Sequence, residues 1–425
     1  MGSAPATHGR EIRVAAVISL LLTAFLVVAP TAQTGGGLQT DGVNWVGTWM
    51  SAQQLVEPGN LPPAPGFGDA TLRQIVHVSI GGRTLRVRFS NAFGRAPLTL
   101  VAARIARASG GSAIDPATDR ALTFGGRPAA TIPEGAALLT DPLDFDLPPL
   151  SNLAVTIYVR GAPPEVTGHP GSRTTSYLQA GNAVSAPALP DAVPVDHWYV
   201  LAGVDVRAPR TAGAVVILGD SITDGRGSTT NGNDRWPDVL ARRLQATPAT
   251  AEVAVLNAGI GGNRLLRDGL GPNALARLDR DVLAQAGARW LIILEGINDI
   301  GTAAGAREKG EPAASADDII GAYAQITERA RTHGIRVCGA TIMPFEGFTY
   351  AGYHTPEGEA DRRRVNDWIR TSGRFDAVID FDAITRDPER PSRLSAAVDG
   401  GDHLHPSAAG YRIMGEAIDL KLFTR

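Results

Sequence analysis

Two patterns of apolar and polar residues follow each other along the chain. Between about residues 43 and 206, short apolar runs are interrupted by polar positions. In the most regular run every second residue from Leu85 to Phe89 is apolar. Strict alternation is typical of antiparallel strands with one buried face and one solvated face. We therefore expect the opposite face of this strand, which carries Arg86 and Arg88, to lie in solvent.

The first part of the chain predicts an all-β fold. Gly81 and Gly82 link two of the runs and are typical of a tight hairpin, so we expect these neighbouring strands to pair. No convincing helical period interrupts the pattern, and many short strands between Gly, Pro and Asp residues indicate a β-sandwich. The expected strands are 43–49, 72–80, 83–90, 97–105, 122–124, 152–160 and 199–206.

Beyond residue 213 the pattern changes to continuous apolar runs separated by helical segments. Their alternation predicts a parallel sheet with helices on both faces. The turn-forming residues 207–213 separate the two patterns, so we expect a β-sandwich accessory domain at 40–207 and an α/β domain at 212–425. The expected strands are 214–218, 253–256, 290–294, 335–342 and 375–379, and the expected helices start at Pro237, near Asn273, at a Ser315 cap, after Thr355 and after Pro406.

The N-terminus carries the features of a secretory signal. Arg10 and Arg13 precede a mostly apolar run over residues 14–29, and small residues follow Pro30. A charged start, an apolar centre and a small-residue exit are typical of a signal peptide, which we place at residues 1–33. We therefore expect a secreted, extracellular protein. An uncleaved anchor stays an alternative, because Pro30 is awkward for cleavage, although the run is short for a membrane span.

Composition narrows the classes of partner. The formal net charge is -3, whereas nucleic acids and acidic membranes call for basic patches, so neither partner is expected. The single cysteine, Cys338, cannot form an internal disulfide. It lies in a strand-like run, where we expect a buried structural thiol.

The most informative stretch is the first apolar run of the second region and the turn after it. Residues 214–218 lead into Gly219, Asp220 and Ser221, with Gly225 shortly beyond. A buried parallel strand delivers the residues that follow it to the carboxyl edge of the sheet, where open α/β sheets bind ligands. Ser221 is therefore a candidate nucleophile. A role as a turn or helix-cap residue is the alternative.

A serine nucleophile needs a base to accept its proton and a carboxylate to orient that base. Asp402 and His405 are three residues apart, just before Pro406 and the last helix. This spacing lets the carboxylate reach the nearer ring nitrogen of His405 while the farther nitrogen faces outward. We expect His403, between them, to be a rim or structural residue. The same stretch also suggests a metal site, but no further histidine pair or cysteine cluster completes one, so we expect no metal.

Two further stretches follow the second and third expected strands and reach the same edge. Residues 257–263 include glycines that let a backbone N–H approach a ligand closely. Residues 295–299 include Asn298, whose side-chain amide can donate a hydrogen bond. With the N–H of Ser221 these groups predict an oxyanion hole for a tetrahedral intermediate. Considered alone, each of the two stretches has a role as a turn.

Four stretches together resemble the sequence blocks of the SGNH (GDSL-type) hydrolase family, in the family's order. The resemblance implies a flavodoxin-like three-layer α/β/α domain with a five-stranded parallel sheet, and ester hydrolysis without a cofactor. It makes Ser221 the nucleophile, His405 the base and Asp402 the orienting acid, with Gly262 and Asn298 as oxyanion donors beside the Ser221 N–H. The first block has Ser-Ile where the name-giving pattern has Ser-Leu. The blocks are 219–222, 257–262, 296–299 and 402–406.

The β-rich region also resembles the front part of a subgroup of exported SGNH esterases, some of them associated with plant polysaccharide degradation. The motifs are 48–51, 72–78 and 88–94. Separately, the aromatic stretch 345–353 makes Phe345, Phe348 and Tyr353 candidate contacts in an acyl or alcohol pocket. The alternative is a loop packed on its own aromatic side chains.

These observations predict a secreted serine esterase that hydrolyses carboxylic esters through an acyl-enzyme. We expect short acyl groups, including acetyl groups on carbohydrates. The expected partner is a small-molecule or polysaccharide-linked ester, with no cofactor and no stable membrane insertion once the signal is removed; the oligomeric state stays open. The alternatives are a lipase or lysophospholipase-type acylhydrolase, a carbohydrate-binding protein with a silent hydrolase domain, and a metal-dependent hydrolase.

Overall fold

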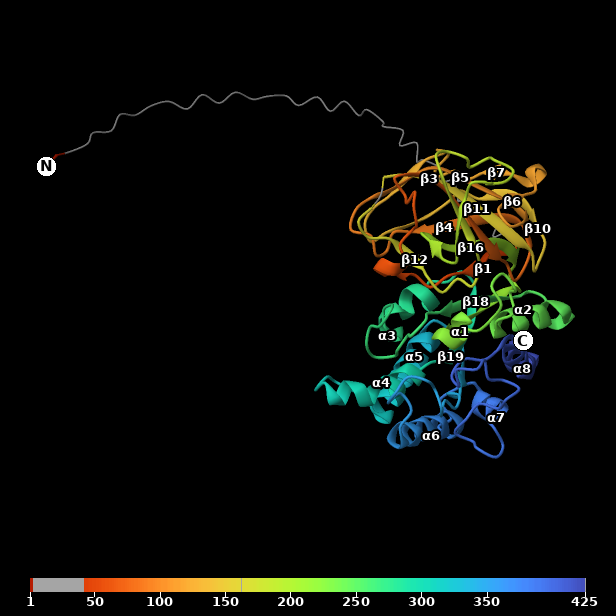
Figure 1. The fold of residues 1–425 in the computed structure, drawn as a ribbon. Helices are drawn as coiled ribbons and strands as arrows, with labels where there is room; N and C mark the ends of the chain where they lie inside the picture. Colours follow the sequence, from red (N-terminus) through yellow and green to blue (C-terminus); the bar gives the residue numbers. More distant parts are fainter. Residues whose placement is uncertain (3–41, 162, 425) are drawn as a thin grey trace, which may run out of the picture. The chain divides into compact units, whose positions relative to one another are not determined.

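Antiparallel sheets fill the first half of the fold, and a parallel sheet with helices fills the second half (Figure 1). The structure, a computed structural model, describes residues 1–2, 42–161 and 163–424. The signal peptide expected at 1–33 therefore lies almost wholly outside the described residues. Gly42–Arg425 form one compact unit. Within the described ranges, no helix is both long and apolar enough to cross a membrane.

The first half, here called the β-rich region, consists of antiparallel strands. Its three sheets have the orders β1-β16-β4-β10, β14-β13-β3-β11-β5-β6 and β15-β12-β2, with β9 beside β4, and β7 and β8 beside β5. The strands are β1 (Val43–Met50), β2 (Gln54–Leu55), β3 (Asp69–His77), β4 (Gly82–Ser90), β5 (Leu98–Gly110), β6 (Ala113–Ile114), β7 (Arg120–Ala121), β8 (Ala130–Ile132), β9 (Ala137–Leu139), β10 (Leu143–Leu147), β11 (Asn152–Arg160), β12 (Thr167–His169), β13 (Ser176–Ala180), β14 (Val193–Val195), β15 (Trp198–Tyr199) and β16 (Leu201–Pro209), with short turns η1 (Pro58–Asn60) and η2 (Pro116–Thr118).

The hairpin expected at Gly81 and Gly82 is wrong. β3 pairs with β11 and β13, whereas β4 pairs with β16, β10 and β9, so the two strands belong to different sheets. Burial explains the difference, because Val78 and Ile80 in the link are 0% and 3% exposed. The link is therefore part of the core between the sheets and not an exposed turn.

The prediction of a solvated polar face on β4 is also wrong. Arg86 and Arg88 both form ion pairs with Asp205 on the neighbouring strand β16, at 2.9 Å and 3.3 Å. The Arg86 guanidinium lies 4.3 Å from the centre of the Trp45 ring. Arg88 also donates to the side chain of Gln285, which belongs to the second half of the chain. This face of β4 thus helps to join the two halves.

The second half, here called the α/β region, is built on a parallel sheet of order β18-β17-β19-β20-β21. All five expected strands are present, and their order along the sheet is the 2-1-3-4-5 order of flavodoxin-like folds. The predicted fold class is confirmed. The strands are β17 (Gly213–Gly219), β18 (Val253–Gly259), β19 (Ala288–Leu294), β20 (Arg336–Ala340) and β21 (Ala377–Ile379).

The five expected helices are present, and Ser315 caps its helix as expected, accepting from the N–H of Asp318 at 3.2 Å. The helix α4 was not expected, because polar residues and small ones, such as Asn298 and Ala303, take buried positions beside its two isoleucines and hide an apolar period. The helices are α1 (Ser221–Asp224), α2 (Trp236–Ala246), α3 (Ala274–Leu278), α4 (Ile297–Glu308), α5 (Ala316–Thr332), α6 (Pro356–Thr371), α7 (Phe381–Thr385) and α8 (Ala408–Ala417), with shorter turns η3 (Pro248–Thr250), η4 (Asp279–Leu283) and η5 (Leu420–Phe423).

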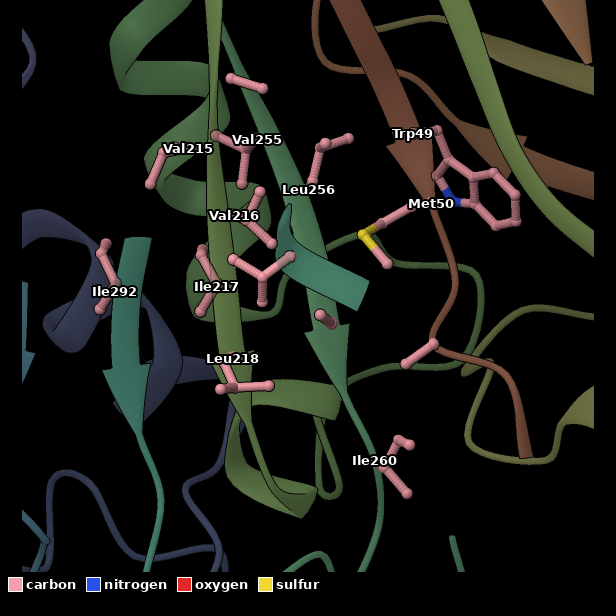
Figure 2. Packing of buried hydrophobic residues seen from close by; sticks show 14 of the residues in the cluster. Trp49, Met50, Val215, Val216, Ile217, Leu218, Val255, Leu256, Ile260 and Ile292 are labelled. Carbon is pink, nitrogen blue, oxygen red and sulfur yellow. The ribbon is translucent and has the colours of Figure 1, made fainter. Parts of the chain in front are cut away.

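The β-rich region covers β18, an edge strand of the parallel sheet. The N–H of Val255 on β18 donates to the Ser79 hydroxyl at 3.1 Å, so a side chain satisfies a backbone group that the sheet leaves free. Figure 2 shows Trp49 and Met50 of β1 on the side of the sheet where Leu256 lies. The boundary expected at 207–212 covers the last three residues of β16 and the link to β17. The division into separate domains stays a prediction.

Candidate active site

Ser221 lies at the carboxyl end of β17, the strand at which the order of the sheet reverses. β17 ends at Gly219, and the chain turns at Asp220 into the short helix α1. Asp220 is the helix cap, because its side chain accepts from the N–H of Ile222 at 2.9 Å. The capping role that was the alternative reading of Ser221 thus belongs to its neighbour. The Ser221 hydroxyl is left to bond elsewhere.

Three expected residues meet in one chain of hydrogen bonds. Ser221 Oγ is 2.9 Å from Nε2 of His405, and Nδ1 of His405 is 2.6 Å from Oδ2 of Asp402. Because a carboxylate accepts, Nδ1 carries the proton and Nε2 is free to accept from the serine hydroxyl. Ser221 and His405 are both 6% exposed. This arrangement can move the proton of Ser221 to His405.

Asp402 is held in its ionised form. Burial opposes ionisation, but hydrogen bonds from the His405 ring and from the backbone N–H groups of His405 and Leu404 lower the pKa of Asp402 well below its usual range. Its Oδ1 accepts both backbone hydrogen bonds, at 3.0 Å and 2.8 Å, and its Oδ2 faces the ring. The carboxylate therefore fixes both the orientation and the tautomer of His405.

Asn298 lies in the first turn of α4, after Gly296 with its φ of 104°. Its amide nitrogen donates to the backbone oxygen of Asn263 at 2.9 Å, and its oxygen accepts from the Tyr353 hydroxyl at 2.6 Å. These contacts fix which way the amide points and leave one amide hydrogen for another acceptor. Gly262, with a φ of 66°, lies next to Asn263. The structure thus links the two stretches expected to supply oxyanion donors.

Sequence reasoning missed a buried arginine beneath these turns. Arg277 is 1% exposed, and its guanidinium joins the ends of three neighbouring strands, β18, β17 and β19. It donates to the backbone oxygens of Gly219 and Ala258, to the Asn263 side chain and to the carboxylates of Asp281 and Glu295, at 2.6–3.4 Å. Arg277 lies in α3, four residues after the Asn273 cap. No feature of the sequence distinguishes Arg277 from an exposed helical arginine.

A group of buried carboxyls surrounds Arg277. Burial raises the pKa of Asp220 to about 7 and that of Asp299 to about 6, and it raises the pKa of Glu295 well above its usual range. Asp299 accepts from the backbone N–H groups of Leu265 and Leu266 at 2.8 Å and 3.3 Å. Asp220 and Asp299 therefore organise the turns of the site.

The aromatic stretch 345–353 divides between core and site. Phe345 is 0% exposed, which places its ring in the core and out of reach of a substrate. The Phe348 ring packs edge-on against His405 at 6.2 Å between ring centres. Tyr353 is half-buried and holds Asn298. Phe348 and Tyr353 thus lie beside the expected catalytic groups, and they also pack on each other, as the alternative reading requires.

His403 turns away from the site. Its Nδ1 lies 2.5 Å from Asp399 Oδ2, and its φ is 65°. Within the described part of the chain, no group of three or more His, Cys, Asp or Glu side chains is placed to hold a metal ion. Cys338 is buried in β20, and burial raises the pKa of its thiol to about 12.

Comparison with known proteins agrees with the motifs. Residues 217–413 match the model of the GDSL-like lipase/acylhydrolase family. No curated protein matches the chain in sequence. Among solved structures, a GDSL-like lipase from Bacteroides thetaiotaomicron is 18% identical, over 48% of this chain and 84% of that chain, with a TM-score of 0.35. An acetylxylan esterase mutant from Geobacillus stearothermophilus is 21% identical, over 50% and 94%, with a TM-score of 0.38.

The matched residues run from β17 through most of α8 and contain Ser221, Asn298, Asp402 and His405. The resemblance to the SGNH (GDSL-type) hydrolases is thereby confirmed for this part of the chain. In residues 217–413 the chain is therefore similar to the GDSL-like lipase/acylhydrolase family.

Proposed function

We propose that the protein hydrolyses carboxylic esters through an acyl-enzyme on Ser221. The observation that carries this proposal is the hydrogen-bond chain from Ser221 through His405 to Asp402, with distances of 2.9 Å and 2.6 Å. Nε2 of His405 accepts the hydroxyl proton as Ser221 Oγ attacks the ester carbonyl carbon. The C–O bond to the alcohol then breaks, and His405 returns the proton to the leaving oxygen.

Water completes the cycle. His405 takes a proton from the water molecule that attacks the acyl carbon, and Ser221 leaves as the restored hydroxyl while the carboxylic acid departs. In both halves a negative charge develops on the carbonyl oxygen. The free amide hydrogen of Asn298 and the N–H groups of Gly262 and Ser221 are the donors proposed to stabilise it.

The surroundings favour a short acyl group and a polar alcohol. Phe348 packs on His405, and the Leu270 side chain lies 3.5 Å from where a side chain on Gly262 would begin, so bulky groups border the site. A hollow of about 390 Å³ adjoins Tyr353, the residue that holds Asn298, and its lining mixes charged side chains with small residues and no long aliphatic side chain. A long aliphatic chain binds best to an apolar lining. The charged side chains in the lining of this hollow favour a carbohydrate instead. The charged residues of the lining are Arg264, Arg267, Glu308, Lys309 and Glu311.

A substrate series tests the proposal. Purified protein is given p-nitrophenyl esters from acetyl to palmitoyl and acetylated xylo-oligosaccharides, with Ser221→Ala as the reference. We expect the highest kcat/KM at acetyl or another short chain, release of acetate from the sugar, and loss of both activities in Ser221→Ala. A maximum at long chains supports the lipase alternative. Equal rates in wild type and Ser221→Ala support a silent domain. Activity that is lost on chelation and indifferent to Ser221→Ala supports a metal-dependent hydrolase.

Export is the second part of the proposal. Its support is the charged start, apolar centre and small-residue exit of the N-terminus. Expression of the full chain in a bacterial host with a general secretion pathway, followed by N-terminal sequencing of the extracellular protein, tests it. We expect a mature N-terminus near residue 34. A full-length chain that stays with the membrane fraction supports the uncleaved anchor.

A further inference from the structure

A histidine of the β-rich region reaches the helix that carries Ser221. His169 is the last residue of β12, and its Nε2 is 2.8 Å from Oδ1 of Asp224, the last residue of α1. The two side chains are 4% and 3% exposed, so substrate does not reach them. The proposed chemistry uses neither residue, although Asp224 is only three positions beyond Ser221.

Both ring nitrogens of His169 face acceptors. Nδ1 is 2.8 Å from the backbone oxygen of Ala52, and Nε2 faces the Asp224 carboxylate. A carbonyl oxygen only accepts, so Nδ1 carries a hydrogen that it donates to Ala52. One further hydrogen lies between Nε2 and the Asp224 carboxyl group. The ring also stacks on Trp198, with 5.7 Å between ring centres.

The His169–Asp224 pair contacts α1 on one side, and β18 contacts α1 on the other side. Asn257 on β18 donates to the backbone oxygen of Thr223 at 2.7 Å. A side chain on Gly259 would overlap the backbone of Asp224, so β18 and α1 are in close contact. On the opposite side, a side chain on Gly171 would overlap the Asp224 carboxylate. α1 is thus enclosed between its own sheet and residues 169–171 of the β-rich region.

We propose that His169 is a positioning residue for the reaction at Ser221. Through Asp224 it fixes α1, and thereby keeps Ser221 Oγ within hydrogen-bond reach of Nε2 of His405. This rests on the proposed function, since it assigns a residue outside residues 217–413 to the same site. The β-rich region is then part of the active site's support, and not only an accessory that binds substrate.

Removal of the contact between His169 and Asp224 is expected to change the position of Ser221, and not a contact with substrate. His169→Ala is expected to lower kcat about 10- to 100-fold, because displacement of a reacting group by about 1 Å has effects of this size. KM is expected to change by less than about threefold, because the pair does not touch substrate. His169→Gln places an amide donor near the Nε2 position and is expected to recover most of the loss. Asp224→Asn, which removes the charge and keeps the shape, is expected to lose less than His169→Ala.

The matched control is His77→Gln. His77 also ends a strand of the β-rich region, and its Nδ1 lies 2.7 Å from Oδ1 of Asn152 in the same region. Among the described residues it forms no hydrogen bond with α1 or with residues 169–171, so this variant is expected to keep the wild-type kcat. A loss shared equally by His169→Ala and His77→Gln contradicts positioning and indicates general destabilisation.

The experiment measures kcat and KM for p-nitrophenyl acetate, Tm, and the rate at which diethyl p-nitrophenyl phosphate modifies Ser221. We expect kcat per titrated site and the phosphorylation rate to fall together in His169→Ala. A kcat within threefold of wild type, or a change confined to KM, overturns the proposal. If His169→Ala does not fold, His169→Gln and Asp224→Asn decide by the same criteria.

The two proposals fail differently. In one outcome, the wild-type protein hydrolyses no ester, but its Ser221 reacts with the phosphate faster than Ser221 in His169→Ala does. This result contradicts the proposed function and supports positioning. A wild-type protein whose Ser221 neither turns over ester nor reacts with the phosphate overturns both. Full ester hydrolysis in every His169 variant leaves the proposed function standing and overturns positioning.

Discussion

The β-rich region buries Arg73 and the α/β region buries Arg277, and the two regions use these arginines differently. Arg73, in the middle of β3, donates to the Thr156 hydroxyl and to the backbone oxygens of Ser112 and Ala186, at 2.6–2.9 Å. All its acceptors are neutral groups of the same region. Arg277 instead donates to the carboxyl ends of β17 and β18, close to the turn that carries Ser221. A buried arginine therefore does not by itself indicate the active site, but a buried arginine at the carboxyl ends of the parallel strands does.

The two regions also depend on each other. The β-rich region covers the edge strand β18 through Ser79 and encloses α1 through His169. The α/β region supplies the residues proposed to react. The comparison predicts that changes at the strand ends of the α/β region remove activity, whereas comparable changes within the β-rich region alter stability, except where that region touches α1.

The largest expected effect comes from His405→Ala. Loss of the base leaves Ser221 without a proton acceptor, so kcat is expected to fall at least about 10,000-fold. Steady-state kinetics on p-nitrophenyl acetate measure it, with circular dichroism as the check on folding. His77→Ala in the β-rich region is the histidine control and is expected to keep kcat, because among the described residues the His77 side chain bonds only Asn152 of the same region. A near wild-type kcat in His405→Ala contradicts the assignment of the active site to the strand ends of the parallel sheet.

The next effect is expected from Asn298→Ala. Its amide is the side-chain oxyanion donor of the proposed mechanism, and loss of one such donor lowers kcat about 100- to 1,000-fold. KM is expected to change little, because the donor acts on the charge that develops in the transition state. Asn152→Ala, at an exposed strand end of the β-rich region, is the matched control. A similar loss in kcat/KM through KM alone contradicts the assignment.

The two buried arginines give the third prediction. Arg277→Met leaves the buried Glu295 without its cation and removes one of the two arginines that Asp281 contacts, which is expected to lower the free energy of unfolding by about 3–5 kcal/mol. It is also expected to lower kcat per titrated site, because the turns lose their common anchor. Arg73→Met leaves neutral acceptors only and is expected to cost about 1–3 kcal/mol with kcat unchanged. Urea unfolding and active-site titration measure both. Equal losses of kcat in Arg277→Met and Arg73→Met contradict the proposed difference between the two regions.

The smallest expected effect is on the pH dependence of stability. Burial raises the pKa of Asp220 to about 7 from an ordinary 3.8, so the folded protein binds this proton more tightly than the unfolded chain. The resulting stabilisation is complete below about pH 4 and is lost as pH rises to about 7. Asp220→Asn keeps the cap acceptor and is expected to flatten this fall, measured as the free energy of unfolding between pH 4 and 7.

Asp141 in the β-rich region provides the opposite sign. Hydrogen bonds from the Thr123 hydroxyl and the N–H groups of Gly126 and Gly125 lower its pKa. Its contribution to stability is therefore present above its ordinary pKa of 3.8 and is lost as pH falls. Asp141→Asn is expected to be less stable than wild type at neutral pH, with the difference shrinking in acid. The same sign for both variants contradicts the assigned environments.

The sequence predicted best where a single physical requirement acts. The five parallel strands are continuous apolar runs because both faces are buried, and the strand-end motifs follow from where such strands deliver the next residue. The prediction of a hairpin at Gly81 failed because glycines permit a turn but do not determine whether the next strand joins the same sheet. The solvated face at Arg86 failed because Asp205, its partner, is 119 residues away.

Contacts that join distant segments were out of reach of sequence reasoning for the same reason. Arg277 bonds groups that lie on three different strands, and His169 meets Asp224 across 55 residues. Nothing local distinguishes these side chains from ordinary polar ones. The helix α4 was missed because polar and small residues take buried positions beside its two isoleucines and hide a helical period. The prediction of Ser221, His405 and Asp402 as interacting residues relied on the combination of motifs, not on any one of them.

The central claim is that Ser221 carries the acyl group during turnover. Rapid quenching of the wild-type protein with p-nitrophenyl acetate, followed by peptide mass spectrometry, tests it most directly. We predict an initial burst of p-nitrophenol and an acetyl group on Ser221, both absent from Ser221→Ala. Ester turnover that continues in Ser221→Ala, without acetylation of Ser221 in the wild type, contradicts the account.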